Sequence, residues 1–152
     1  MIFVTVGTHQ QPFPRLIEAL ASLEPADLIV QHGNSPAPEG AREAVPFLPF
    51  PDILDRMRAA QAVVSHAGVG SILLARRLGH TPVVVPRQRR YDEHVDDHQV
   101  GLTRAFAEVH LVIPVWDVNG LKAAVAGVPP LAMSRPAKAT ALQQAVRRAL
   151  DG

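Results

Sequence analysis

The stretch Val63-Val64-Ser65-His66-Ala67-Gly68-Val69-Gly70-Ser71-Ile72 decides the fold. Its two β-branched apolar residues are typical of the end of a buried strand, and the small residues after them favour a tight turn before a helix that begins at about Ser71. The first turn of such a helix offers free N–H groups and the positive end of the helix dipole. The stretch is neither the six-residue dinucleotide fingerprint nor a Walker loop. It therefore predicts either a phosphate site or only a tight strand-to-helix turn.

Short apolar segments alternate with helical patterns on both sides of this stretch. We expect strands over residues 2–6, 28–31, 44–48, 62–65, 82–86 and 111–113. We expect helices over residues 15–23 (with Pro14 in the first turn), 53–60 (with Asp52 as N-cap), 71–78 (closed by Gly79), 97–108 and 118–126. The alternation predicts an α/β protein with a Rossmann-like parallel sheet and helices on both faces. A further amphipathic helix is expected over residues 137–150, where Leu142, Val146 and Leu150 recur at spacings of four.

Length and composition restrict the class of protein. The chain has 152 residues, a formal net charge of +1 and no cysteine. This length predicts a single domain over residues 1–152, and the balanced charge argues against a nucleic-acid partner. Residues 1–6 are too short for a signal peptide, and no apolar run approaches the ~20 residues that span a bilayer. The absence of cysteine fits a reducing compartment. We therefore expect a cytoplasmic chain that, if it works at a membrane, reaches the inner face of that membrane through a partner.

Candidate functional residues follow the ends of the expected strands. Gly7 and Thr8 come directly after the first strand, and the polar run 87–99 follows strand 82–86. Ligands of open parallel sheets bind at the carboxyl ends of the strands, so we expect these residues to face the same crevice as the glycine turn. His9 projects from the first turn, where an imidazolium would stabilise leaving-group charge and a neutral ring would act as a base.

The polar run allows three interpretations. The first is a solvated loop whose opposite charges offset one another. The second is a metal site, because His94 and His98 are four residues apart and a helix would place both imidazoles on one face beside Glu93 and Asp97. The order of the zinc peptidases, His-Glu-x-x-His, is absent because Glu93 precedes His94.

The third interpretation is a sugar-binding helix start. The carboxylate of Asp97 and the amide of Gln99 accept and donate the hydrogen bonds that vicinal sugar hydroxyls require. Arg87, Arg89 and Arg90 would then meet a diphosphate, or anionic lipid headgroups if they face outward.

Four motifs in this order resemble the carboxyl-terminal domain of glycosyltransferase family 28. They are Phe3-Val4-Thr5-Val6-Gly7-Thr8, Ser65-His66-Ala67-Gly68-Val69-Gly70-Ser71, Gly79-His80-Thr81-Pro82-Val83-Val84-Val85-Pro86 and Glu93-His94-Val95-Asp96-Asp97-His98-Gln99. The resemblance covers roughly residues 1–108 and is closest to the stand-alone form of the domain. That form includes PssE-type exopolysaccharide subunits and the cytosolic subunit of the two-subunit transferase that adds the second N-acetylglucosamine to dolichol-linked oligosaccharides. The resemblance implies the nucleotide-sugar-binding, C-terminal half of a GT-B enzyme.

The resemblance also implies roles for single residues. Gly7 and Thr8 would lie near the diphosphate of a UDP-linked donor, the backbone of Phe50 would read uracil, and Asp97 with Gln99 would hold the sugar hydroxyls. The candidate substrate-binding residues are Gly7, Thr8, Phe50, His66, Ala67, Gly68, Val69, Gly70, Ser71, Arg87, Glu93, His94, Asp97, His98 and Gln99, and the candidate catalytic residue is His9.

Some of these positions have a simpler structural explanation. A hydrogen-bonded structural role explains His66 better than a catalytic one, and turn geometry alone explains the glycines as well as the approach of a ligand does. One position departs from the family pattern, because Leu74 stands where many members have a ribose-binding Glu.

The hypothesis that follows is the donor-binding subunit of an inverting glycosyltransferase. It would transfer N-acetylglucosamine or another hexose from a UDP-sugar to a lipid-linked acceptor, without a cofactor or bound metal. A membrane-associated subunit would supply the acceptor side, and the chain alone would have little activity because a facing domain is needed to close the site. Self-association is left open. The alternatives are a non-catalytic nucleotide-sugar sensor or scaffold, and a metal-dependent hydrolase built on His94, Asp97 and His98.

Overall fold

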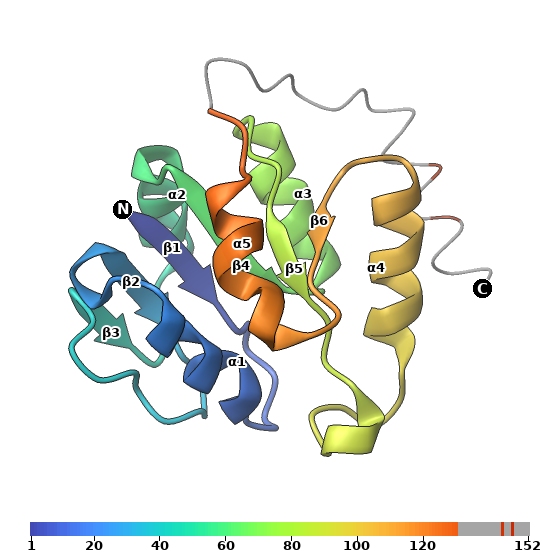
Figure 1. Ribbon diagram of the computed structural model, residues 1–152, viewed down its shortest axis with the longest axis horizontal. Helices are drawn as coiled ribbons and strands as arrows, with labels where there is room; N and C mark the ends of the chain where they lie inside the picture. Colours follow the sequence, from blue (N-terminus) through green and yellow to red (C-terminus); the bar gives the residue numbers. More distant parts are fainter. Residues whose placement is uncertain (131–143, 145–146, 148–152) are drawn as a thin grey trace.

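Parallel strands form the centre of the computed structural model of the protein, which describes residues 1–130, 144 and 147 (Figure 1). The strands are β1 (Ile2–Thr5), β2 (Leu28–Gln31), β3 (Glu43–Val45), β4 (Ala62–His66), β5 (Val83–Val85) and β6 (Ile113–Pro114). In the described residues they form one sheet in the order β3-β2-β1-β4-β5-β6. The α/β class and the parallel sheet predicted from the sequence are thereby confirmed.

Helices connect the strands. They are α1 (Pro14–Ala19), α2 (Phe50–Ala59), α3 (Val69–Arg77), α4 (His98–Glu108) and α5 (Leu121–Ala126), with the short 3₁₀ helices η1 (Leu20–Ser22), η2 (Pro25–Asp27), η3 (Arg89–Tyr91) and η4 (Val118–Gly120). The helix expected over residues 137–150 lies, apart from residues 144 and 147, outside the described residues. No helix in the described part of the chain combines the length and the apolar character needed to cross a membrane.

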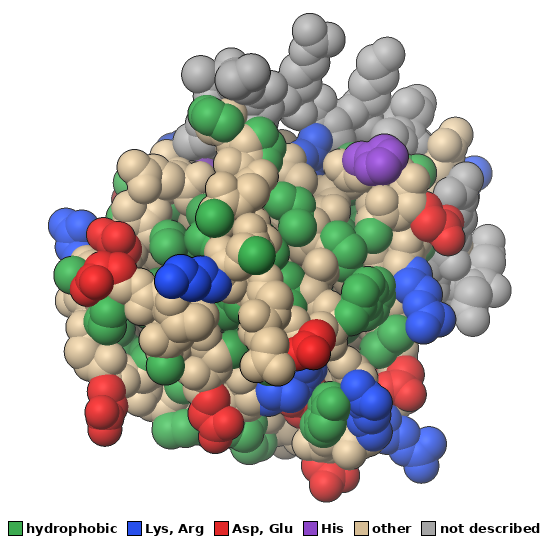
Figure 2. Space-filling model, in the orientation of Figure 1, with side chains coloured by type: hydrophobic (Ala, Val, Ile, Leu, Met, Phe, Trp, Pro, Cys, Tyr) green, Lys and Arg blue, Asp and Glu red, His purple; other side chains and the backbone are tan. Residues whose placement is uncertain are grey.

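Alternate residues of the central strands enter different hydrophobic cores. On one face, Val4 and Val64 belong to a core that includes Leu16 of α1 and Leu121 of α5. On the opposite face, residues of β1, β4 and β5 pack against α2, α3 and α4 in two clusters, which contain Phe3, Val63, Met57 and Ala75, and Val84, Ile72, Leu102 and Phe106. The sheet is therefore covered by helices on both faces, as its apolar strands require. Figure 2 shows the face with α1 and α5, where acidic and basic side chains are interspersed.

The strand register brings three loops to one edge of the sheet. Thr5 of β1 is paired with Ser65 of β4, and Ser65 is paired with Val84 of β5. Because these strands are parallel, the loops that follow them leave the sheet at nearly the same level. The segments that begin at residues 6, 67 and 86 therefore meet at the carboxyl edge.

The helix after the glycine turn begins at Val69, two residues before the predicted start, so that Gly70 and Ser71 lie in its first turn. It ends at Leu78. Gly79 follows with φ of +88°, the left-handed conformation that glycine adopts without penalty. The prediction of Gly79 as the residue that closes this helix is confirmed.

Prolines explain two differences from the predicted elements. The strand expected over residues 44–48 ends at Val45, because Pro46 has no N–H for the ladder. The next helix begins at Phe50, with Pro49 at the N-cap, so Asp52 lies in the first turn and the prediction that it caps the helix is wrong. Its carboxylate there still complements the helix dipole.

The last strand is also displaced from its expected position at residues 111–113. Leu111 and Val112 are buried in the core beside α4, and pairing with β5 begins at Ile113. Leu111 and Val112 are as apolar as a strand, so their sequence alone did not show that they precede the strand and do not pair with β5.

Candidate functional site

Three loops at the carboxyl edge bring most of the predicted site residues together. Gly7, Thr8 and His9 follow β1, His66 ends β4 ahead of the glycine turn, and residues 86–97 join β5 to α4. Because β1, β4 and β5 are adjacent in the sheet, these groups share one region. Phe50 does not follow one of these three strands. It begins α2 after the edge strand β3, and β2 lies between β3 and β1 in the sheet. Its side chain is 63% exposed.

His66 forms the floor of this region and is packed between two glycines. A Cβ atom on Gly7 would lie 2.3 Å from His66 Nε2, and a Cβ atom on Gly68 would lie 2.4 Å from His66 Cε1. Gly7 also has φ of +78°. Both glycines are therefore required by the packing of the imidazole. Gly70 is different, since a Cβ atom there would have no neighbour within 4 Å.

Gln99 fixes the orientation and tautomer of His66. Its Oε1 accepts the backbone N–H of Arg87 at 3.0 Å, so its Nε2 is directed to His66 Nδ1 at 3.4 Å. An amide nitrogen only donates, so Nδ1 accepts and the proton of the neutral ring is on Nε2. Burial, with smaller contributions from the charges of Arg87, His9 and His94, lowers the pKa of His66 to about 3. His66 is therefore a neutral side chain at physiological pH.

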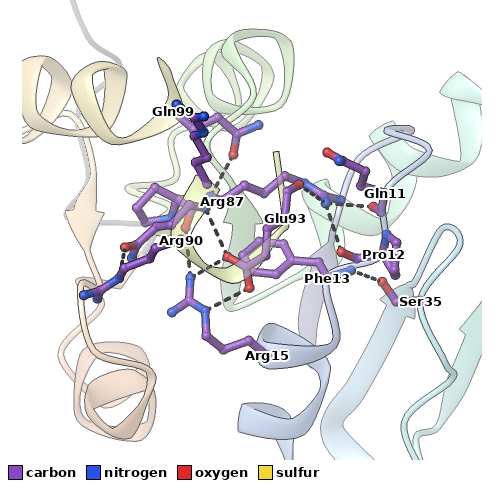
Figure 3. A network of polar contacts seen from close by, with 12 residues as sticks. Gln11, Pro12, Phe13, Arg15, Ser35, Arg87, Arg90, Glu93 and Gln99 are labelled. Carbon is purple, nitrogen blue, oxygen red and sulfur yellow. Dashed lines mark hydrogen bonds and ion pairs between the residues drawn. The ribbon is translucent and has the colours of Figure 1, made fainter. Parts of the chain in front are cut away.

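Arg87 lies below the site and connects two of its loops (Figure 3). Its side chain is fully buried. Nη2 donates to the carbonyl of Val6 at 3.0 Å, and Nη1 donates to the carbonyls of Gln11 at 2.8 Å and Glu93 at 3.0 Å. The guanidinium also stacks 4.8 Å from the ring centroid of Phe13. Burial lowers its pKa to about 10, so the group remains charged at neutral pH.

A second ion pair extends this network. Arg15 of α1 donates Nε and Nη2 to the two carboxylate oxygens of Glu93, at 2.9 and 3.0 Å, and Glu93 also accepts the backbone N–H of Gln88 at 3.1 Å. Glu93 is only 1% exposed. Arg87 and Glu93 were predicted to bind substrate, but both are buried and their hydrogen bonds position the loops. Nη1 and Nη2 of Arg87 and both carboxylate oxygens of Glu93 bind the protein, whereas the buried Nε of Arg87 has no hydrogen-bond partner among the described residues.

The exposed part of the site is made by the start of α3 and the start of α4. Gly70 is exposed in the first turn of α3, whose N–H groups have no acceptor within a helix and suit an anion. Asp97 and His98 are exposed at the start of α4, and Asp97 Oδ1 accepts the backbone N–H of Arg89 at 2.9 Å. Thr8 is exposed on the opposite loop. Of the predicted Asp97 and Gln99 pair, only Asp97 is open to a ligand, because Gln99 is buried.

The residues expected for a metal site do not come together. His94 lies in the loop before α4, which begins at His98, so the two imidazoles do not share a helical face. Nδ1 of His94 is instead 3.2 Å from Asp96. Among the described residues, no three His, Asp or Glu side chains form a cluster that fits a metal ion. The described residues therefore provide no metal site for the alternative in which the protein is a metal-dependent hydrolase.

Several supporting residues were not recognised in the sequence. Arg15 lies 78 positions from Glu93, and no local pattern links them. Phe13 is fully buried beside both arginines, and its N–H donates to Ser35 Oγ at 2.6 Å. One signal was available for Arg87, since a charged residue that directly continues a buried strand must find partners inside the protein.

Comparison with known proteins identifies the family. The model of the glycosyltransferase family 28 C-terminal domain matches residues 1–150. The chain belongs to this family. A relative of this chain, the UDP-N-acetylglucosamine transferase subunit ALG13 of Yarrowia lipolytica (strain CLIB 122 / E 150), is 31% identical to it over 130 residues. The match takes in 74% of this chain and 64% of that protein, so the chain spans less than two thirds of its relative's length.

A solved structure supports the fold assignment. The crystal structure of CalG4, the calicheamicin glycosyltransferase, is similar to this chain with a TM-score of 0.56 and 17% sequence identity. The match covers 99% of this chain and 38% of the CalG4 chain. The predicted correspondence to part of a GT-B glycosyltransferase is confirmed at the level of the fold.

Replacement of Arg87 tests its structural role. Arg87→Met keeps the length of the side chain but leaves the carbonyls of Val6, Gln11 and Glu93 without their donor, and we expect a loss of about 3–5 kcal/mol in the free energy of unfolding. Arg90→Met, at an exposed arginine of the same loop, is expected to change it by less than about 0.5 kcal/mol. Urea denaturation of the three proteins measures both effects, and equal effects of the two substitutions would contradict the assignment.

The buried neutral His66 predicts a pH dependence of stability. Its pKa is about 3 in the folded chain and 6.5 in the unfolded chain, so the unfolded state binds the extra proton as the pH falls below 6.5. This group alone then lowers the free energy of unfolding by up to about 1.4 kcal/mol per pH unit between 6.5 and 3.

Urea denaturation between pH 7.5 and 4.5 measures this slope. The variant His66→Gln is expected to be less stable at pH 7.5 but to have a shallower slope, with His9 and His80, whose pKa values are also lowered, supplying part of the remainder. The control His110→Asn, at an exposed histidine with positive φ, is expected to keep the full slope. A slope unchanged in His66→Gln would show that His66 does not titrate as stated.

Proposed function

We propose that this chain is the donor-binding subunit of an inverting glycosyltransferase. It binds a UDP-sugar whose sugar is N-acetylglucosamine or another hexose, and it transfers that sugar to a lipid-linked acceptor. A membrane-associated subunit supplies the acceptor side of the site. The observation that carries the proposal is the family 28 match over nearly the whole chain. The printed name of the ALG13 relative, a UDP-N-acetylglucosamine transferase subunit, supports the choice of donor.

The geometry of the carboxyl edge is compatible with this donor. The proposed place for the diphosphate is the first turn of α3, where the backbone at Gly70 is uncovered and the helix dipole favours negative charge. Thr8 faces the same edge from the loop after β1. Asp97 is exposed at the start of α4 and is proposed to accept hydrogen bonds from sugar hydroxyls. Phe50 is proposed to contact uracil through its backbone.

The proposed reaction is a single displacement at the anomeric carbon. A base removes the proton of the acceptor hydroxyl, the new glycosidic bond forms as the bond to UDP breaks, and cationic groups stabilise the charge of the departing diphosphate. We assign stabilisation of the leaving group to His9 and the base to the acceptor-side subunit. The neutral His66 is assigned to the floor of the site, where it shapes the backbone of Gly7 and Gly68.

Titration calorimetry with UDP and UDP-N-acetylglucosamine tests the donor site. Gly70→Ala places a methyl group where the protein leaves space, so we expect an unchanged fold but a loss of about tenfold or more in affinity for both ligands. Asp97→Asn is expected to weaken UDP-N-acetylglucosamine by about tenfold and UDP much less, since it removes one acceptor for the sugar. Gly120→Ala, at another open glycine, is the control for both. Absence of binding by the unchanged protein would overturn the proposal.

The partner requirement makes a separate prediction. The purified chain is expected to transfer sugar from UDP-N-acetylglucosamine to a lipid-linked acceptor at a rate near background, because the proposed acceptor-side subunit, which would form the facing half of the site and exclude water, is left out of the assay. Addition of the acceptor-side subunit should restore transfer, and a chelator should leave the restored rate unchanged. Rapid transfer by the chain alone would contradict partner dependence, and no transfer with any partner would favour a nucleotide-sugar sensor.

A further inference from the structure

Two histidines from different loops contact each other at the carboxyl edge. His9 follows β1 and His94 lies between β5 and α4, and their ring centroids are 4.8 Å apart with an angle of 34° between the ring planes. Both side chains are partly buried, and 17% of the His94 side chain remains exposed. A ligand at this edge can therefore reach the pair, while the protein fixes the distance between the rings.

The two rings share one kind of hydrogen bond, because Nδ1 of each accepts the backbone N–H of the residue two positions further on. His9 Nδ1 accepts the backbone N–H of Gln11 at 3.1 Å, so a neutral His9 carries its proton on Nε2. His94 Nδ1 accepts the backbone N–H of Asp96 at 3.4 Å and lies 3.2 Å from Asp96 Oδ1, so a charged His94 forms an ion pair with that carboxylate. In both neutral rings Nδ1 thus accepts a backbone N–H and the proton is on Nε2, while His94 also has an acidic neighbour.

The charges around the pair disfavour a second proton. Burial lowers the pKa of His9, and the charges of Arg87 and His94 lower it further. His66 lies within electrostatic range of both rings but remains neutral, with a pKa of about 3. Glu93, the nearest buried carboxylate in this loop, is paired with Arg15. Two imidazolium rings in contact would repel each other, and the exposed Asp96 beside His94 would offset part of that repulsion.

A bound diphosphate would favour the second proton that the surrounding charges otherwise disfavour. Two negative charges beside the rings favour the charged form of each imidazole, and both rings then donate N–H groups to phosphate oxygens. We propose that His9 and His94 form a proton-linked pair that binds the diphosphate of the donor, taking up a proton from solvent when the diphosphate binds and releasing it when UDP leaves. This inference rests on the proposed donor site and adds its coupling to pH.

The proton uptake has a consequence for transfer. Departing UDP carries one more negative charge than the bound sugar nucleotide, and that charge develops beside a pair that has already taken up its proton. The pair therefore stabilises the leaving group without a proton transfer in the displacement step.

The test uses UDP-N-acetylglucosamine as the probe. Its diphosphate is esterified at both ends and does not titrate between pH 6 and 8, whereas UDP has a terminal phosphate with a pKa of about 6 that would obscure the effect. We expect the affinity of the full chain to rise about tenfold from pH 8 to pH 6. At pH 7, calorimetry in buffers of different ionisation enthalpy should show net proton uptake on binding.

Three variants make the test specific. His9→Gln and His94→Gln keep a hydrogen-bonding side chain without a titrating ring. Each variant is expected to bind UDP-N-acetylglucosamine at pH 8, and its affinity should change less than about threefold between pH 8 and pH 6. His110→Asn, whose histidine follows the far end of α4, should keep the full pH dependence. Thermal unfolding checks that all variants are folded.

The outcomes separate this inference from the proposed function. Binding of UDP-N-acetylglucosamine with no pH dependence and no proton uptake overturns the inference and leaves the donor site standing. A pH dependence that survives in both His9→Gln and His94→Gln also overturns it. No binding at any pH overturns the donor site and the histidine pair together.

Discussion

The buried guanidinium of Arg87 is the interaction on which the carboxyl edge depends. Burial of a charge costs several kcal/mol unless it is paired and hydrogen-bonded, and here Nη1 and Nη2 donate to backbone carbonyls while Phe13 covers the planar face. Since those carbonyls belong to the loop after β1 and the loop after β5, neither loop can move without disturbing the other. The edge is therefore organised before any ligand is present, which lowers the entropy that binding must overcome.

The site consists of a buried floor and an exposed rim, and the two have different physical roles. His66, Gln99 and Arg87 form the floor, where Gln99 binds both His66 and the backbone of Arg87 and the two Nη atoms of Arg87 donate to backbone carbonyls. Gly70 and Asp97 belong to the rim and are open to solvent. Floor residues act through the shape and stability of the loops, whereas rim residues act through direct contact with a ligand. Sequence proximity mixes the two classes, because Asp97 and Gln99 are only two positions apart.

The fold could be predicted because each central strand is buried on both faces and therefore consists of a short run of apolar residues. Element boundaries failed where local chemistry changed the outcome, as at Pro46, which stops β3, and at Pro49, which moves the start of α2. In the site, the glycine turn and the polar run were found because they are local patterns. The pairing of Arg15 with Glu93 and the contact of His9 with His94 were not, because they join positions far apart in the chain through packing that no local pattern encodes. For the same reason, none of the three interpretations of the polar run predicted that its first and seventh members, Arg87 and Glu93, are buried.

The packing of His66 between two glycines makes three positions dependent on one another in evolution. A side chain at position 7 or 68 is excluded by the imidazole, so a histidine at 66 and glycines at 7 and 68 form a set that tolerates change only together. Loss of the imidazole would remove the steric barrier at position 68, whereas position 7 would still be restricted by its positive φ. Homologues in which position 66 carries a smaller side chain are therefore the ones in which position 68 is free to vary.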